Sequence, residues 1–269
     1  MRRSRMLAIG VTVPALGLAA AIIGTGIPAQ AASAVHYVAL GDSYSSGQGA
    51  GSATGSCEQS PNAYAALWAK ANSPASFTFA ACGGATTSDV INNQLSSLST
   101  STTLVSVTIG GNDVGFGTIM ETCVLDSTTA CENVISAAEK YANNTLPGLL
   151  DETLSGIRSH APNAKIVVLD YPDFYDLGAW LCLIMSSADH TALDNGINDL
   201  DSVIQAAAVR NGDAFADVRS EFSSHEICSG STWLNGLTLP IDNSYHPNAN
   251  GQKLGYLPAF SAAAASAGQ

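Results

Sequence analysis

Residues 37–45 read Tyr-Val-Ala-Leu-Gly-Asp-Ser-Tyr-Ser, an apolar run that passes into a glycine and a polar turn. Short apolar runs of this kind are typical of strands that are covered on both faces of a sheet. We therefore predict a strand over Tyr37–Leu40, with Ser43 just beyond its carboxyl end. A hydroxyl group there lies at the mouth of the sheet, next to the free amides of a helix N-terminus. A serine that only caps a helix would fit this segment equally well.

Similar apolar runs recur along the chain, separated by segments with the character of helices. Further strands are predicted at Phe77–Ala80, Leu104–Ile109, Lys165–Leu169 and Ala214–Val218. Helices are predicted at Ala63–Lys70, Ser88–Leu98, a long segment that reaches His160, His190–Arg210 and Asn248–Ala264. Strands that alternate with helices predict an α/β fold, with about five parallel strands and helices on both faces of the sheet.

Glycine-rich segments follow the second and third predicted strands, at Cys82–Gly84 and at Gly110–Asp113. In parallel sheets, ligands bind outside the carboxyl ends of the strands. The backbone amides of Ser43 and Gly84 and the side-chain amide of Asn112 are therefore candidate donors to the oxyanion of a tetrahedral intermediate. Simple turns are the alternative explanation for both segments.

A serine hydroxyl needs a neighbouring base, because it stays protonated at neutral pH. His246 lies directly before the last predicted helix, whose start is marked by Pro247. A fixed loop of this kind can hold an imidazole against Ser43. The remaining histidines are more typical of solvated or capping positions: His36, His160, His190 and His225.

The first 31 residues place three arginines before an apolar stretch, residues 6–23, and end in an Ala-x-Ala site at 29–31. This pattern is typical of a secretory signal peptide. A transmembrane anchor is the alternative, which the glycines and proline at 24–28 disfavour. We therefore predict a secreted, extracellular protein with one domain, residues 32–269, and no integral membrane anchor after processing.

The chain is acidic, with 10 Lys+Arg against 22 Asp+Glu and a formal net charge of −12. Loss of the leader would remove three arginines and no acid, which leaves 7 basic against 22 acidic side chains and a charge of −15. Such a surface repels nucleic acid and anionic lipid headgroups. We expect a monomer that binds no nucleic acid and contacts lipid only locally, through apolar side chains.

Six cysteines lie in the part that would be exported, and an even number in an oxidising compartment predicts disulfides. Nearness in sequence favours a small loop between Cys123 and Cys131. It then favours the pairs Cys57 with Cys82 and Cys182 with Cys228. No Cys-x-x-Cys pair occurs and the cysteines are dispersed, so no metal site is expected.

The segments that carry these candidates occur in the order found in a known superfamily. The chain resembles the GDSL, or SGNH, hydrolases, and within them the secreted actinomycete lipases and phospholipases. Four blocks carry the resemblance: Gly41–Ser45, Ala80–Ala85, Ile109–Asp113 and Tyr245–Pro247. It implies a three-layer α/β/α sandwich of flavodoxin-like type and ester hydrolysis without a metal or cofactor. It also implies Ser43 as the nucleophile, His246 as its base, and an oxyanion hole formed by Ser43, Gly84 and Asn112.

One position departs from the family pattern, which usually places an acid three residues before the histidine. Here that position is Asn243, and Asp242 stands one residue earlier. An asparagine cannot carry the charge that stabilises an imidazolium. Some members with a similar arrangement use a main-chain carbonyl instead. The resemblance therefore implies a Ser-His dyad supported by the Ser244 carbonyl, with Asp242, reached by a shift of the loop, as the second candidate.

An apolar run, Leu177–Met185, follows the fourth predicted strand and is a candidate surface for an acyl chain. It is too short to span a bilayer. The alternative is a buried helical turn pinned by a disulfide. Aromatic side chains that could line the same groove are Tyr44, Phe116 and Trp233.

The expected substrate is a fatty acyl ester, as for a lipase or long-chain carboxylesterase. A phospholipase A acting on glycerophospholipid and an acetyl esterase acting on polysaccharide are alternatives with the same chemistry. The acetyl esterase predicts a shallow, polar site. A non-catalytic binding module is disfavoured, because it predicts a broken site and the candidate residues are all present.

Overall fold

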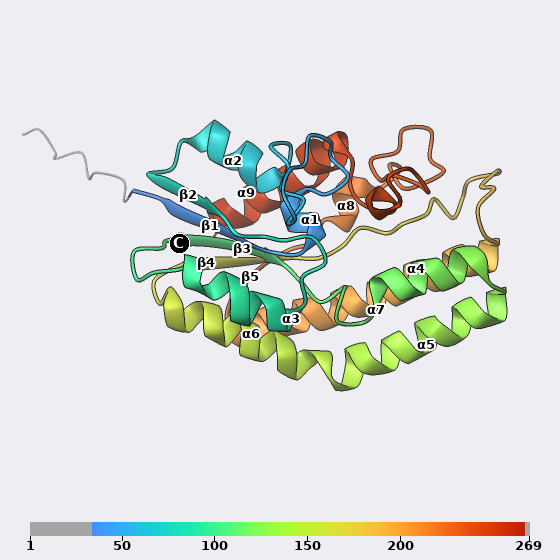
Figure 1. Ribbon diagram of the computed structural model, residues 1–269, viewed down its shortest axis with the longest axis horizontal. Helices are drawn as coiled ribbons and strands as arrows, with labels where there is room; N and C mark the ends of the chain where they lie inside the picture. The colour runs from blue at the N-terminus through green and yellow to red at the C-terminus, as the bar shows by residue number, and fades with distance from the viewer. Residues whose placement is uncertain (1–33, 267–269) are drawn as a thin grey trace, which may run out of the picture. The chain divides into compact units, whose positions relative to one another are not determined.

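The computed structural model describes residues 34–266, and the predicted leader, 1–31, lies outside this range. A sheet of parallel strands forms the centre of the fold, in the order β2-β1-β3-β4-β5 (Figure 1). The strands are β1 (His36–Gly41), β2 (Ser76–Phe79), β3 (Leu104–Thr108), β4 (Lys165–Leu169) and β5 (Ala214–Ala216). The predicted α/β fold is confirmed, because each predicted strand is present: Lys165–Leu169 has the predicted bounds, and the other four differ by one or two residues at one or both ends.

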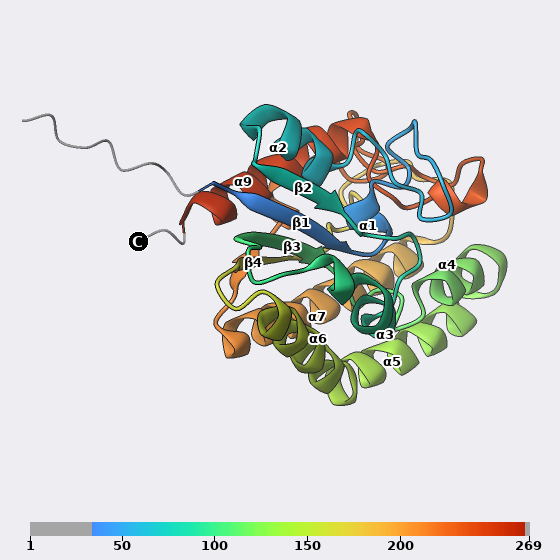
Figure 2. The ribbon, with the colours of Figure 1, turned by 60° about the vertical axis from the view of Figure 1, so that its left-hand side comes forward.

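Helices cover both faces of the sheet, so that the predicted three layers are present (Figures 1 and 2). One face carries α2 (Tyr64–Asn72), α8 (Arg219–Phe222), the π-helical turn η4 (Gly251–Tyr256) and α9 (Leu257–Ser266). The other carries α3 (Thr87–Asp89), the short turns η1 (Val90–Gln94) and η2 (Leu95–Ser97), α5 (Thr128–Asn144), α6 (Leu146–His160) and α7 (Ser187–Asn211).

The central strands are buried on both faces, whereas the edge strand β2 is half exposed. On one side, the ring of Tyr37 stacks on Phe260 at a centroid distance of 5.4 Å. On the other side, Leu154 and Ile157 of α6 are buried. The apolar layers on both faces hold the strands in place, and their carboxyl ends form a fixed edge.

Several helical segments differ from the prediction. The predicted helix Ser88–Leu98 is divided into α3, η1 and η2, and the short helix α8 was not predicted. The long helix that reaches His160 is in fact two helices, α5 and α6, because the chain turns at Thr145 and Pro147 then stands in the first turn of α6. A helix that was not predicted, α4 (Phe116–Leu125), precedes α5. Together with α5 and α7, it covers the side of the molecule beyond the carboxyl ends of the strands (Figure 1).

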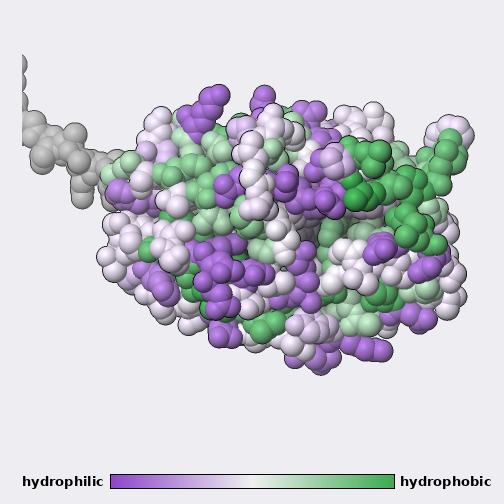
Figure 3. All heavy atoms as spheres, in the orientation of Figure 1, coloured by the Kyte–Doolittle hydropathy of each residue, from purple (hydrophilic) through white to green (hydrophobic). Residues whose placement is uncertain are grey.

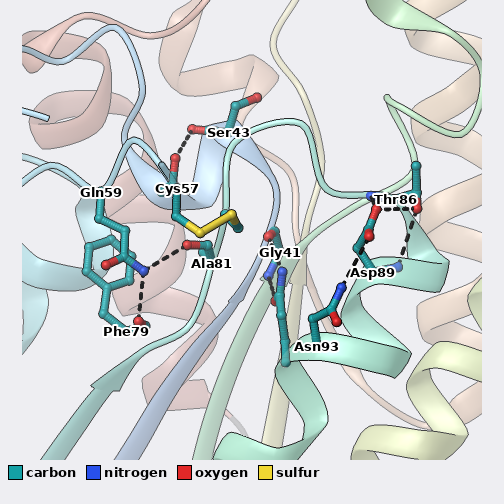
Figure 4. Close-up of a disulfide and its surroundings, with 12 residues drawn as sticks. Gly41, Ser43, Cys57, Gln59, Phe79, Ala81, Thr86, Asp89 and Asn93 are labelled. Atoms are coloured by element: carbon teal, nitrogen blue, oxygen red, sulfur yellow. Dashed lines mark hydrogen bonds between the residues drawn. A yellow bond between two sulfur atoms is a disulfide. The ribbon is translucent and has the colours of Figure 1, made fainter. Parts of the chain in front are cut away.

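Disulfides join Cys57 to Cys82, Cys123 to Cys131 and Cys182 to Cys228, the pairs that nearness in sequence favours. The Cys57–Cys82 disulfide links the loop after the short helix α1 (Ser43–Ser46) to the loop after β2 (Figure 4). The side-chain amide of Gln59 donates to the carbonyl oxygens of Phe79 and Ala81, each at 2.9 Å. These links fix the segment that leads to Gly84 beside Ser43.

Candidate active site

The end of β1 positions Ser43 as the first residue of α1. Gly41 has φ +119°, and a Cβ there would lie 2.4 Å from the carbonyl oxygen of Thr108, so only glycine allows this close turn. Asp42 caps the helix, since its carboxylate accepts from the amide of Tyr44 at 2.9 Å. The end of the strand and the helix cap together fix Ser43 just beyond the carboxyl edge of the sheet.

Tyr171 ties three strand ends together beneath Ser43. Its hydroxyl donates to the carboxylate of Asp42 at 2.5 Å and accepts from the amide of Gly111 at 3.0 Å. Burial raises the pKa of Asp42 to about 7, although the hydrogen bonds from Tyr171 and Tyr44 oppose the rise. Tyr171 was not predicted as a site residue. Its place just after β4, at the carboxyl edge of the sheet, was the signal for it.

His246 lies against Ser43. Its Nε2 is 2.8 Å from Ser43 Oγ, and its Nδ1 is 2.9 Å from the carbonyl oxygen of Ser244. The ring is 5% exposed and lies near the rings of Tyr44 and Phe116, with centroids 5.2 and 6.0 Å away. Burial lowers the pKa of His246 to about 4, while the Ser244 carbonyl and the charge of Asp242 oppose this shift. The imidazole is therefore neutral at pH 7 and can accept a proton.

The two candidates for the third member lie in different places. The Ser244 carbonyl contacts the ring directly, whereas the side chain of Asp242 is exposed and makes no hydrogen bond within residues 34–266. The main-chain carbonyl of Asp242 accepts from Gln48 Nε2 at 2.5 Å, which ties this loop to the segment after α1. The contact to Nδ1 is thus made by main chain, with Asp242 near enough only to exert its charge.

Asn235 holds the histidine loop in place. Its carbonyl accepts from the amide of Tyr245 at 2.8 Å, and its amide donates to the carbonyl of His246 at 2.9 Å. Its side chain donates to the carbonyl of Gly49 at 3.0 Å. The hydroxyl of Tyr44 also donates to the Tyr245 carbonyl, at 2.6 Å. Sequence reasoning missed Asn235, because Asn followed by Gly is the usual composition of a turn.

The residues of the three candidate oxyanion donors, Ser43, Gly84 and Asn112, line one cleft together with His246. Within residues 34–266, the amides of Ser43 and Gly84 donate to no other group. Gly84 has φ +76°, and the neighbouring amide of Gly83 is held by the Cys57 carbonyl at 2.9 Å. Asn112 donates to the carbonyl of Ala85 at 2.9 Å, which uses one of its two side-chain N–H groups and leaves the second for the cleft.

Two hollows meet at Ser43, which lines both of them together with Asn112, Phe116 and Met120. One is the open cleft. The other is a narrow, largely apolar cavity between α4, α5 and α7. Its apolar lining comprises Val114, Phe116, Ile119, Met120, Ile135, Ala138, Ala142, Phe174, Leu193, Ile197 and Leu200.

The apolar run Leu177–Met185 lines neither hollow, so its assignment as the acyl surface is wrong. It is not a buried helical turn either, because it forms a largely exposed loop. Tyr44 and Phe116 line the inner cavity and not a groove shared with this run. Trp233 stacks on His225 at a centroid distance of 3.6 Å and lines neither hollow. His190 was expected to be solvated and is buried.

Known proteins are similar to this chain along most of its length. A model of the GDSL-like Lipase/Acylhydrolase family matches residues 39–254. Lipase 1 of Streptomyces coelicolor is 48% identical over 269 residues, covering 98% of this chain and 100% of that protein. The lipase of Streptomyces rimosus is 45% identical with the same coverage.

Solved structures agree with the sequence matches. The crystal structure of phospholipase A1 from Streptomyces albidoflavus NA297 has a TM-score of 0.83 and 50% identity, covering 85% of this chain and 99% of that chain. The crystal structure of the extracellular lipase from Streptomyces rimosus has a TM-score of 0.83 and 47% identity, covering 86% of this chain and 100% of that chain.

Proposed function

The chain belongs to the GDSL-like lipase/acylhydrolase family and is a carboxylic ester hydrolase, and we propose that Ser43 is its nucleophile and His246 its general base. The observation that carries the proposal is the 2.8 Å contact between Ser43 Oγ and His246 Nε2. Neutral imidazole accepts the serine proton as Oγ attacks the acyl carbon. The acyl carbon that Oγ attacks therefore lies in the cleft that Ser43 lines.

The developing oxyanion is stabilised by the amides of Ser43 and Gly84 and the side chain of Asn112. Each such donor contributes about 3 kcal/mol in a preorganised site. His246 then gives its proton to the departing alcohol, and an acyl ester remains on Ser43. A water molecule, deprotonated by the same imidazole, attacks that ester and releases the carboxylic acid. Both half-reactions thus use one dyad and one set of donors.

During each half-reaction His246 is briefly an imidazolium, whose Nδ1–H donates to the Ser244 carbonyl at 2.9 Å. A carbonyl dipole supports this cation less strongly than a carboxylate does, but it fixes the tautomer and the ring orientation equally well. The charge of Asp242 adds a smaller, long-range contribution. The proposed machinery is therefore a Ser-His dyad steadied by main chain.

The substrate is a fatty acyl ester, because the cavity that opens on Ser43 is narrow and apolar. A straight acyl chain gains about 0.8 kcal/mol for each methylene group that it buries. An acetyl group would leave most of that lining unused, so the cavity favours a long acyl chain over the acetyl esterase alternative.

A phospholipase A activity is the second candidate, and the outer cleft supports it. Glu58, Glu121 and Asp242 line that cleft, and no lysine or arginine does. Acidic walls suit the cationic end of a zwitterionic headgroup and repel an anionic one. The similar protein from Streptomyces albidoflavus is itself described as a phospholipase A1.

We also propose that the chain is exported, with residues 1–31 as its leader. Its disulfides suit an oxidising compartment, and the similar lipase of Streptomyces rimosus is described as extracellular. No helix within residues 34–266 is long and apolar enough to cross a bilayer.

The test compares the enzyme and its Ser43→Ala variant on p-nitrophenyl esters with acyl chains from acetyl to palmitoyl, and on phosphatidylcholine. We expect kcat/KM to rise with chain length and the variant to be inactive on every ester. Release of fatty acid from phosphatidylcholine would establish the second activity. Full activity of the variant, or a preference for acetate, would contradict the proposal.

A further inference from the structure

Large apolar side chains are exposed around the mouth of the cleft. The most exposed are Trp180, Leu239 and Leu183, with 94%, 88% and 83% of their surface accessible. We call the following set the apolar rim: Leu125, Trp180, Leu183, Leu237, Leu239 and Ile241. Figure 3 shows apolar atoms gathered at one end of the molecule, the end at which α4 and α5 meet in Figure 1. An exposed apolar patch at a substrate site marks an interaction surface.

The rim is continuous with the cleft, although it comes from three separate segments. Leu125, Leu237 and Ile241 line the cleft itself, together with Ser43 and His246. The segment that carries Trp180 and Leu183 ends at Ser186, whose hydroxyl lies 3.2 Å from that of Thr128, just beyond α4. Three rim residues thus border the opening through which a substrate reaches Ser43, and the segment with Trp180 and Leu183 is tied to the chain just after Leu125.

The loop that carries Trp180 and Leu183, residues 177–185, is held in position by contacts with the rest of the protein. The Cys182–Cys228 disulfide anchors it, and Nε2 of His190 lies 2.6 Å from the carbonyl oxygen of Ile184. That ring also stacks on Tyr175 at a centroid distance of 3.9 Å. These contacts fix the backbone and leave Trp180 and Leu183 pointing outward.

The charge around the rim limits which lipid surface it can meet. No lysine or arginine occurs in residues 71–139, 166–209 or 220–252, and every rim residue lies in one of these stretches. Glu121, Asp126 and Asp242 lie beside rim residues in the sequence or the cleft. An anionic membrane would repel this face, whereas a zwitterionic lipid surface carries no opposing net charge.

We propose that the apolar rim docks the enzyme on a zwitterionic lipid surface, with the cleft opening directly onto the lipid. This inference rests on the proposed function, because a lipid ester is presented at such a surface and not as a free molecule. Docking places the acyl chain next to the apolar cavity, so that it passes from lipid to protein without crossing water. Burial of the rim side chains in the lipid interface makes the free energy of binding favourable.

The test measures binding to vesicles of ether-linked phosphatidylcholine, which the enzyme cannot hydrolyse. The variant Leu183→Ser/Leu239→Ser removes two rim side chains that line neither hollow. Its matched control, Val209→Ser/Leu254→Ser, changes two exposed apolar residues away from the rim. We expect at least about tenfold weaker binding for the rim variant and no change for the control. Binding should shift the fluorescence of Trp180 to the blue, and Trp180→Phe should remove that shift.

Hydrolysis of a soluble butyrate ester should stay within about twofold in the rim variant, because the catalytic residues are untouched. Wild-type failure to bind, equal binding by the rim variant, or tighter binding to vesicles rich in anionic phosphatidylglycerol would each overturn the proposal. So would a wild-type dimer that the rim substitutions dissociate, since the rim would then be an interface between copies. Loss of the proposed function would be seen separately, as ester hydrolysis that survives Ser43→Ala.

Discussion

Replacement of Asp242 by alanine separates a dyad from a triad. In the structure the side chain of Asp242 is exposed and contributes to the pKa of His246 only by its charge, after burial and the Ser244 carbonyl. An exposed charge that acts without a direct contact is worth roughly 1 kcal/mol or less. Asp242→Ala should therefore lower kcat/KM by no more than about fivefold. Since Gln48 donates to the main-chain carbonyl of Asp242, that link persists in the variant.

The assay is kcat/KM on a soluble p-nitrophenyl ester at low and at high salt, with His246→Ala and Asp126→Ala measured beside Asp242→Ala. His246→Ala should lose on the order of 10⁴-fold or more. Asp126→Ala removes another exposed acid and should have almost no effect. About 1 M salt should abolish the small effect of Asp242→Ala, because exposed charges are then screened. A loss that approaches that of His246→Ala, at either salt concentration, would refute the dyad.

Three further predictions concern the oxyanion donors, the base and the acyl cavity. Asn112→Ala should lower kcat by about 10²- to 10³-fold with little change in KM, because its free N–H group acts on the oxyanion; an equal rise in KM would assign it to substrate binding. Because His246 must be neutral to accept a proton and burial lowers its pKa to about 4, kcat/KM should rise with pH through about 4 and be level by pH 6. A midpoint near the ordinary value of 6.5 would contradict this environment for the ring. Ala142→Leu adds three carbons to the cavity lining and should lower the preference for palmitate over acetate by roughly fiftyfold, at about 0.8 kcal/mol per methylene. Ala137→Leu, on the exposed side of α5, should leave that preference unchanged.

The parts of the site that follow strands could be predicted because strand ends can be located from the sequence. A buried strand of a parallel sheet is an apolar run, and the polar or glycine residue that ends it lies at the carboxyl edge. Ser43 and Asn112 stand just after two such runs, so their proximity follows from the sheet. His246 comes from a loop, so its prediction as the base depended on the helix start marked by Pro247 and on the resemblance to the family.

The parts made by contacts between distant segments could not be predicted. The helix α4 begins after Gly115 and contains Gly117, which lowers its intrinsic propensity, and it is stabilised by packing of Met120 and by the disulfide of Cys123. Because α4 supplies one wall of the acyl cavity, the cavity could not be predicted without that helix.

For the apolar run 177–185, a cavity wall was predicted where the structure has an exposed loop. Its composition is compatible with a buried turn, a cavity wall or an exposed loop, and only the three-dimensional structure distinguishes them. Trp180 is exposed because Cys182, within the run, is bonded to Cys228, which is 46 residues away in the sequence and cannot be inferred from the run itself. Periodicity indicates which residues are apolar, but not what covers them.

Covalent trapping can show whether Ser43 is the nucleophile and whether His246 activates it. Diethyl p-nitrophenyl phosphate releases p-nitrophenolate when a serine Oγ attacks its phosphorus, and leaves a diethylphosphoryl group on that oxygen. Peptide mass mapping should find this group on Ser43 alone, in step with the loss of ester hydrolysis. His246→Ala should slow labelling by several orders of magnitude, and Ser43→Ala should not be labelled. A label on another residue would show that Ser43 is not the nucleophile, and labelling of Ser43 at an undiminished rate in His246→Ala would show that His246 does not activate it.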